Sequence, residues 1–146
     1  MSRYSDRKDY SKFGAYHYWV WRRIKKIYPD IGHSEFCALL MADSFYRRGG
    51  FFTVGEVIRC IALNEDSADM KNYMRNYFSG LDNKGYTSKD DSTGGFGRGK
   101  LRTITPKGLN LIQFYNRACG EFHTSTYENA LKNAPKKKKK LNKRRS

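Results

Sequence analysis

The segment from residue 71 to residue 79, KNYMRNYFS, carries side chains that could form hydrogen bonds with nucleic-acid bases. In a DNA major groove, arginine forms bidentate pairs with guanine and asparagine with adenine. Asn72, Arg75 and Asn76 are therefore candidate base-reading residues, and Lys71 and Ser79 are expected to lie nearer the phosphates. The segment contains no carboxylate that would repel a polyanion. A solvated helix face could have the same composition, so the residues that follow decide between the two interpretations.

The next segment, residues 82–109, reads DNKGYTSKDDSTGGFGRGKLRTITPKGL and has the pattern of a helix end, a hairpin and a helix start. Gly85 suits a left-handed C-cap, and residues 86–89 and 100–104 are of strand type. The glycine-rich residues between them predict a connection. Thr105 and Pro106 predict the start of a new helix. A donor-rich helix followed by such a hairpin is typical of a winged helix-turn-helix, whose second helix lies in the major groove.

The predicted wing, residues 86–104, is basic near its glycine-rich tip. Arg98, Lys100 and Arg102 are candidate DNA-binding residues, because a guanidinium at such a tip can enter a narrow minor groove. Phe96 could act as an apolar wedge, but packing back on its own hairpin is the more common arrangement. The glycines match neither the GxGxxG nor the P-loop spacing, so a phosphate-binding loop is rejected.

Apolar residues recur with helical spacing along most of the chain. The pattern predicts helices over residues 14–28, 34–48, 53–63, 67–83 and 106–122, and a short sixth helix before Pro135. Ser34 is expected to cap the second helix. Capping boxes are expected at Thr53 with Glu56 and at Ser125 with Glu128. The predicted fold class is mainly α with a small β-hairpin: a winged helix-turn-helix with flanking N- and C-terminal helices.

A single domain over residues 13–133 accounts for these elements. Residues 1–12 lack an apolar period and are expected to form a flexible arm, and the lysine-rich residues 134–146 to form a disordered tail. The net charge is +15, and residues 136–146 hold eight Lys or Arg and no acid, which leaves +7 for the rest. Such a surplus favours nucleic acid as a partner. For the tail, we favour a tether that contacts phosphates over a nuclear localisation signal or a solvated tail.

Other classes of protein are not favoured by the sequence. The three cysteines have no CxxC spacing, which argues against a disulfide framework and a zinc site. His17, His33 and His123 are far apart in the sequence, and adjacent Asp90 and Asp91 are more typical of a turn than of a metal site. We therefore expect no enzyme activity, no cofactor and no metal.

No segment has the length of a membrane span or the apolar centre of a signal peptide. We therefore expect no contact with a membrane. The expected location is the cytoplasm, in association with the nucleoid, or the nucleus if the host is eukaryotic.

From Ser34 to Glu121, the order of elements resembles the MarR-type winged-helix family of DNA-binding regulators. The resemblance rests on FTVGEVIRCIAL, MKNYMRNYFSGLDNKGY and LRTITPKGLNLI, and most of all on the junctions Leu81–Tyr86 and Ile104–Gly108. It implies a homodimer in which helices 14–28 and 106–122 of two chains interlock. It also implies a pseudo-palindromic DNA site. The dimer or core residues would then be Trp19, Val20, Ile24, Leu111, Tyr115 and Phe122.

The leading hypothesis is sequence-specific binding of double-stranded DNA by a regulator of transcription. The alternative is a structural nucleic-acid-binding protein, ribosome-associated or packaged with a genome, that uses the winged helix without sequence specificity. A third interpretation is a winged helix that presents the same donor face to an acidic protein. Co-purifying nucleic acid would distinguish the first two, and loss of all DNA affinity at low salt would indicate the third.

Overall fold

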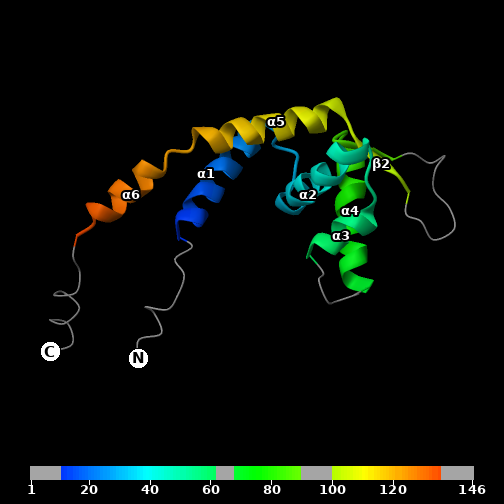
Figure 1. Ribbon diagram of the computed structural model, residues 1–146, viewed down its shortest axis with the longest axis horizontal. Coiled ribbons are helices and arrows are strands. Elements are labelled where there is room, and N and C mark those ends of the chain that lie inside the picture. Colours follow the sequence, from blue (N-terminus) through cyan, green and yellow to red (C-terminus); the bar gives the residue numbers. More distant parts are fainter. Residues whose placement is uncertain (1–10, 62–67, 90–99, 136–146) are drawn as a thin grey trace.

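The computed structural model describes residues 11–61, 68–89 and 100–135 of the chain (Figure 1). In this part of the chain four helices come first: α1 (Ser11–Ile27), α2 (His33–Gly49), α3 (Val54–Ile61) and α4 (Ala68–Asn83). A hairpin of β1 (Thr87–Lys89) and β2 (Arg102–Ile104) follows, and then α5 (Pro106–Glu121) and α6 (Thr124–Lys132). The prediction of a mainly helical chain with one small β-hairpin is confirmed, and the arrangement is consistent with a winged helix.

The core of the molecule lies where α2 meets α3 and α4. α2 is buried on two sides, as its sequence predicts, because Phe36 and Ala38 lie on nearly opposite faces of the helix and are each only 1% exposed. The core side of α4 contributes three residues that are at most 2% exposed, Met74, Phe78 and Leu81. Burial of this one side fixes which face of α4 points to solvent.

α1 and α5 pack against each other and close the core from the other side. Val20 and Leu111 are buried on the two helices. The ring of Phe36 on α2 joins them, because its centroid lies 5.2 Å from that of Trp21 and 5.3 Å from that of Tyr115. The apolar stripes of α1 and α5 are therefore largely covered within one chain.

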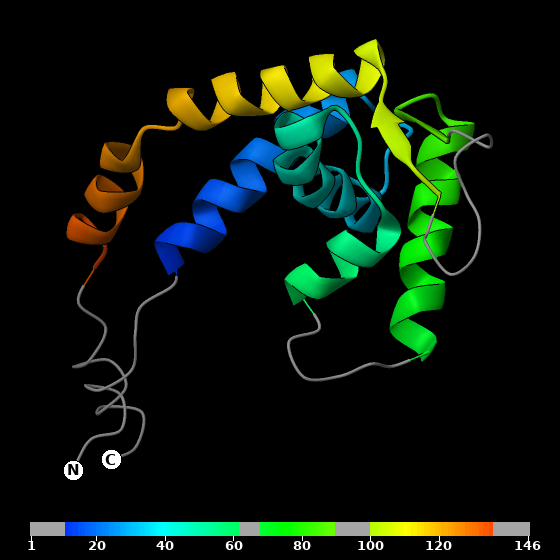
Figure 2. The same ribbon diagram turned by 45° about the vertical axis from the view of Figure 1, so that its right-hand side comes forward.

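α6 lies beside the N-terminal part of α1, at the end of the molecule opposite to α4 and the sheet (Figures 1 and 2). The hydroxyls of Ser11 and Tyr127 are hydrogen-bonded, and Lys12 Nζ lies 3.0 Å from Glu128 Oε1. Ser11 and Lys12 therefore belong to α1, and the prediction that they form part of a flexible arm is wrong. The remainder of that arm, the tip of the wing and most of the tail lie outside the described residues.

The sheet is held to the helical body by a third segment of chain. Thr87 lies opposite Ile104 and Lys89 opposite Arg102 in the antiparallel pair. The backbone of Phe52, between α2 and α3, pairs with Arg102 through two hydrogen bonds of 2.9 and 2.8 Å. This bridge was not predicted, because residues 51–52 have no strand pattern of their own. It fixes β2, and with it the base of the wing, against the core.

Several helix ends follow the local sequence. Gly85 has a φ of 85° at the end of α4, and the Tyr86 N–H donates to the Leu81 carbonyl at 2.9 Å, so β1 begins one residue later than predicted. The Thr53 N–H donates to Glu56 Oε1 at 2.9 Å and the Glu56 N–H to Thr53 Oγ1 at 3.2 Å, which confirms the capping box. The Thr105 hydroxyl accepts from the Gly108 N–H at 3.2 Å, as expected for an N-cap.

Two predicted caps are wrong. Gly32, rather than Ser34, is the N-cap of α2, because Glu35 Oε1 accepts from the Gly32 N–H at 2.8 Å. His123 is the N-cap of α6, and no side chain caps that helix. The predicted box of Ser125 with Glu128 does not form, since the Glu128 carboxylate is paired with Lys12 on α1. The Gly32–Glu35 contact is local, whereas the Lys12–Glu128 contact joins two helices that are far apart in the sequence.

Candidate nucleic-acid interface

The candidate base-reading residues lie on the solvent-exposed face of α4. Asn72, Arg75, Asn76 and Ser79 are all exposed, and Lys71 is partly exposed. Positions 72, 75, 76 and 79 share one face because residues three and four apart are neighbours on a helix. Met74 and Phe78, on the other side, are buried. The structure therefore brings these residues together on one open surface, here called the α4 face and defined as Lys71, Asn72, Arg75, Asn76 and Ser79.

Tyr73 is a further candidate on α4 that sequence reasoning missed. Its side chain is 57% exposed, although most large aromatic side chains of this chain pack against the core. The exposure of Tyr73 could have been predicted from its position, because it lies outside the apolar stripe formed by Met70, Met74 and Phe78. A tyrosine hydroxyl at this position could donate to a phosphate oxygen beside the groups that contact bases.

The base of the wing adds positive charge next to the sheet. Lys89 at the end of β1 and Lys100 before β2 are both exposed. Lys100 was predicted as a DNA-binding residue from its place beside the glycine-rich tip, whereas Lys89 was not singled out. Arg98 and Phe96, the residues on which the predicted contact of the wing tip with a minor groove depends, lie outside the described residues.

Arg102 has a structural role, and its prediction as a DNA-contacting residue is wrong. Its side chain is 9% exposed, and its guanidinium forms an ion pair with Asp82 at the end of α4. The same carboxylate accepts a hydrogen bond of 2.6 Å from the Thr87 hydroxyl on β1. The guanidinium also lies 5.7 Å from the centre of the Phe78 ring. Arg102 therefore joins α4 to both strands and has no free surface to offer a phosphate.

The structural role of Arg102 could have been predicted from the alternation of side chains along the strand. Side chains two apart on a strand point to the same side, so Arg102 shares a side with Ile104, which is 3% exposed. A cation on the buried side of a strand needs a carboxylate partner. Asp82 lies 20 residues earlier in the chain, and only the folded structure shows that it is that partner.

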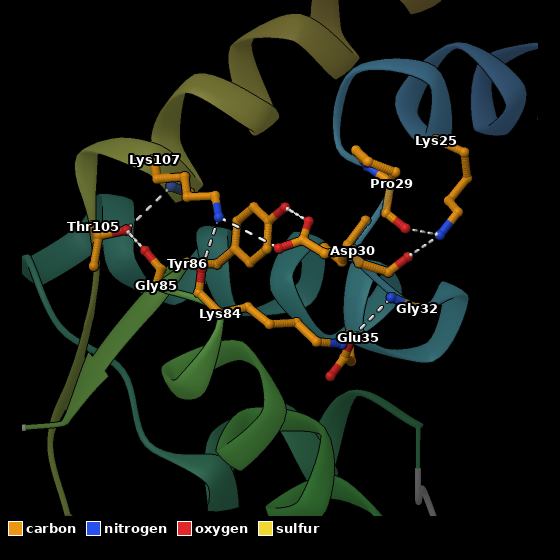
Figure 3. A network of polar contacts seen from close by, with 12 residues as sticks. Lys25, Pro29, Asp30, Gly32, Glu35, Lys84, Gly85, Tyr86, Thr105 and Lys107 are labelled. Carbon is orange, nitrogen blue, oxygen red and sulfur yellow. Dashed lines mark hydrogen bonds and ion pairs between the residues drawn. The ribbon is translucent and has the colours of Figure 1, made fainter.

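A network of polar contacts joins the wing to the loop between α1 and α2 (Figure 3). The buried Tyr86 donates its hydroxyl proton to Asp30 Oδ1 at 2.5 Å. Lys107 at the start of α5 lies 3.5 Å from the other Asp30 oxygen and donates to the Lys84 carbonyl at 2.7 Å. The hydrogen bond from Tyr86 lowers the pKa of Asp30, and Lys107 lowers it further. Burial, followed by the bond to Asp30, raises the pKa of Tyr86.

The same network continues from the end of α4 to the start of α2 (Figure 3). Lys84 Nζ lies 2.6 Å from Glu35 Oε1, the oxygen that also accepts from the Gly32 N–H. At the other end, the Thr105 hydroxyl donates to the Gly85 carbonyl at 2.5 Å. These contacts thus hold three segments together as one unit: the end of α4, the base of the wing and the start of α5. The α4 face and the base of the wing are presented by this unit in a fixed relation.

The histidines are arranged differently from what their spacing in the sequence suggested. His17 on α1 and His33 on α2 are brought together, with 2.8 Å between their Nε2 atoms. Cys37 Sγ lies 3.9 Å from the His33 ring. Burial, and then the neighbouring His17, lower the pKa of His33. Among the described residues, no group of three or more His, Cys, Asp or Glu side chains is arranged to hold a metal ion.

Neither a protein-family model nor a curated protein sequence matches the chain. None of the helices within residues 11–61, 68–89 and 100–135 is both long enough and apolar enough to cross a membrane. Function must therefore be inferred from the surfaces of the molecule.

Proposed function

We propose that this protein binds double-stranded DNA with sequence preference and acts as a regulator of transcription. The observation that supports this proposal most directly is the α4 face: exposed arginine, asparagine and serine side chains on a helix whose other side is buried. The face has no carboxylate over residues 71–79, and the base of the wing beside it adds Lys89 and Lys100. A surface of this kind suits a polyanion with hydrogen-bonding groups in a groove.

The dimensions of α4 fit a major groove. Its 16 residues correspond to a length of about 24 Å, and a B-DNA major groove, roughly 12 Å wide, admits one α-helix. Arg75 would pair with a guanine edge, and Asn72 and Asn76 with adenine edges. Lys71, Ser79 and Tyr73 would contact phosphates on either side. In this orientation the wing would approach the neighbouring minor groove.

The rigidity of the unit favours specific recognition over loose electrostatic contact. Arg102 with Asp82, and Tyr86 with Asp30, hold α4 and the hairpin in one arrangement before any ligand binds. Binding by a preorganised surface loses less conformational entropy than binding by a flexible one. A fixed spacing between the α4 face and the wing also determines which grooves they can enter together.

The proposal is tested by selecting bound sequences from random duplex DNA. Wild-type protein should enrich a motif, and Arg75→Ala should relax one base position at a cost of about 1 to 3 kcal/mol. Arg117→Ala is the matched control, because it removes the same charge from an exposed position of α5, away from the α4 face. We expect Arg117→Ala to keep the motif and nearly the same affinity.

Two other results would count against the proposal. Binding without enrichment would support the alternative of a structural nucleic-acid-binding protein. Loss of all DNA affinity at low salt would instead favour an acidic protein as the partner of the α4 face.

The homodimer implied by the MarR-type resemblance stays a prediction. Within one chain, α1 and α5 already bury much of their apolar surface against each other. The two halves of a dimer would therefore have to meet through apolar residues that stay exposed, such as Ile27 at the end of α1. Sedimentation with and without duplex DNA would establish whether one or two chains bind a site.

A further inference from the structure

α1 and α6 lie at the end of the molecule opposite to α4 (Figure 2). A groove lies between these two helices, which we call the α1–α6 groove. Its volume is about 1170 Å³. Five aromatic side chains line it: Tyr18, Trp19 and Trp21 from α1, Phe122 after α5, and Tyr127 from α6. The groove thus has a largely aromatic floor, and no part of the proposed DNA interface contributes to it.

The charge of the groove has one sign. Arg22, Arg23, Lys25 and Lys26 line it, and among the described residues no carboxylate does. Arg23 forms an ion pair with Glu121, and Lys25 donates to backbone carbonyls after α1, so these two cations are engaged within the molecule. Arg22 and Lys26 are exposed and lie four residues apart on one side of α1. Arg22 donates to the Tyr18 hydroxyl at 3.2 Å, but neither cation has a carboxylate partner within the described residues. Two cations at the rim are therefore available to an acidic ligand.

The helices beside the groove leave apolar surface uncovered. α6 has nine residues and none is buried, although Tyr127 and Leu131 form an apolar stripe, and Leu131 is 57% exposed. On α1, Tyr18 is 62% exposed. A helix as short as α6 gains most of its stability from tertiary contacts. A third helix lying along the groove would cover Tyr18 and Tyr127, which line it from the two helices.

We propose that the α1–α6 groove binds an acidic amphipathic helix of a partner protein. The apolar side of that helix would lie on the aromatic floor, and its carboxylates would reach Arg22 and Lys26 at the rim. This is the helix-in-groove mode of recognition, in which residues at i, i+3, i+4 and i+7 insert between two helices. The proposal goes beyond DNA binding and does not depend on it, because it uses the other end of the molecule.

Other occupants suit the groove less well. A second copy docked through the same surface would bring Arg22 and Lys26 of two chains together without a carboxylate between them, which is unfavourable. Single-stranded nucleic acid would need open ring faces for base stacking, whereas aliphatic side chains also pack against ring edges. Here cations lie over three of the rings: Arg23 over Trp19 at 4.8 Å, Arg22 over Tyr18 at 5.8 Å and Lys25 over Trp21 at 5.9 Å. Carboxylates are favourable neighbours for such an array.

The test uses the full chain and a fluorescein-labelled peptide of about 18 residues, with leucine at i, i+3, i+4 and i+7 and glutamate at most other positions. Its control is a scrambled peptide of the same composition, which matches its charge and so accounts for attraction to the lysine-rich tail. Fluorescence anisotropy should show binding of the amphipathic peptide at least about tenfold tighter than binding of the scrambled one.

Two variants locate the binding site. Tyr18→Ala, and the double variant Arg22→Glu with Lys26→Glu, should each weaken binding of the amphipathic peptide by about tenfold. All three positions are exposed, and circular dichroism would confirm that the variants fold. Arg75→Ala on the α4 face is the control and should leave binding of the peptide unchanged, whether or not it affects DNA.

The proposal is overturned by any of four results. These are equal affinity for the two peptides, no binding below about 1 mM, unchanged affinity in the folded groove variants, and self-association that Tyr18→Ala abolishes. A fifth such result is binding of a short single-stranded DNA that is lost in the groove variants but kept in Arg75→Ala, because it would assign the groove to a different ligand. The duplex selection has no bearing on these outcomes, so the two proposals fail separately.

Discussion

At the scale of single residues, Arg75 and Arg102 show how environment determines the role of an arginine. Arg75 is exposed on α4, whereas Arg102 lies on the buried side of β2 and forms an ion pair with Asp82. Both have the same side chain, and both were predicted to contact DNA. Burial separates them, because a buried guanidinium without a partner carries a large desolvation cost. This correction does not change the α4 face, because Arg102 is not part of it. Arg102 instead holds the end of α4 against β2.

The pair of His17 and His33 leads to a prediction on pH dependence. Burial and the neighbouring His17 hold the pKa of His33 below its ordinary value near 6.5. The unfolded chain therefore binds more protons than the folded one as the pH falls through this range. This contribution to stability is present above pH 6.5 and is lost as the pH falls through the folded-state pKa.

We accordingly expect the midpoint temperature of thermal unfolding to be lower at pH 5.5 than at pH 7.5. In His33→Gln, the difference between the two midpoints should be smaller. His123→Gln is the matched control, because His123 lies at the start of α6 and does not contact this pair. The groups that face His33 are His17, Cys37 and Trp21. The same pH dependence in wild type and His33→Gln would contradict the prediction.

At the scale of elements, the close approach of α5 to the start of the hairpin positions the wing. Gly108 lies in the first turn of α5, directly over the end of α4 and the strands. A Cβ at Gly108 would lie 2.3 Å from the Tyr86 carbonyl oxygen and 2.7 Å from Ile104 Cγ2. By contrast, Gly120 near the other end of α5 has nothing within 4 Å of such an atom. The same helix therefore provides a test site and its control.

We expect Gly108→Ala to reduce the free energy of unfolding by about 2 to 3 kcal/mol, because a backbone oxygen must move to make room. Gly120→Ala should instead increase it by up to about 1 kcal/mol, since alanine is the better helix former. Urea denaturation monitored by circular dichroism would give both values. If both substitutions stabilised the protein, the contact of α5 with Tyr86 would not be tight.

At the scale of the whole molecule, the two proposed surfaces lie at opposite ends. The α4 face and the base of the wing are at one end, and the α1–α6 groove is at the other (Figure 1). DNA and a helical partner could therefore bind at the same time. The positive charge of the chain extends well beyond these surfaces, since residues 136–146 alone hold eight Lys or Arg.

A tail that contacts phosphates should change the dependence of DNA affinity on salt. Each phosphate contact contributes about −0.9 to the slope of log affinity against log salt concentration, so four or five contacts would contribute about −4. Replacing the eight Lys and Arg of residues 136–146 with Gln should flatten the slope by that amount and leave the selected motif unchanged. An unchanged slope would exclude the tether and leave a nuclear localisation signal or a solvated tail as the interpretation of residues 136–146.

Features that depend on neighbours a few residues away could be predicted from the amino-acid sequence. The helices followed from apolar spacing, the end of α4 from Gly85, and the starts of α3 and α5 from Thr53 and Thr105. The exposed side of α4 also followed, because its apolar stripe had only one way to be buried. Each of these features rests on backbone geometry or on contacts within about one helical turn.

Features that need a partner from elsewhere in the chain could be seen only in the folded molecule. Arg102 forms an ion pair with Asp82, and Glu128 forms one with Lys12 in place of the predicted capping box at the start of α6. His33 on α2 is hydrogen-bonded to His17 on α1, and the groove forms because α6 lies beside α1. The physical reason is that charge pairing and burial depend on distances in space, which spacing along the chain does not determine.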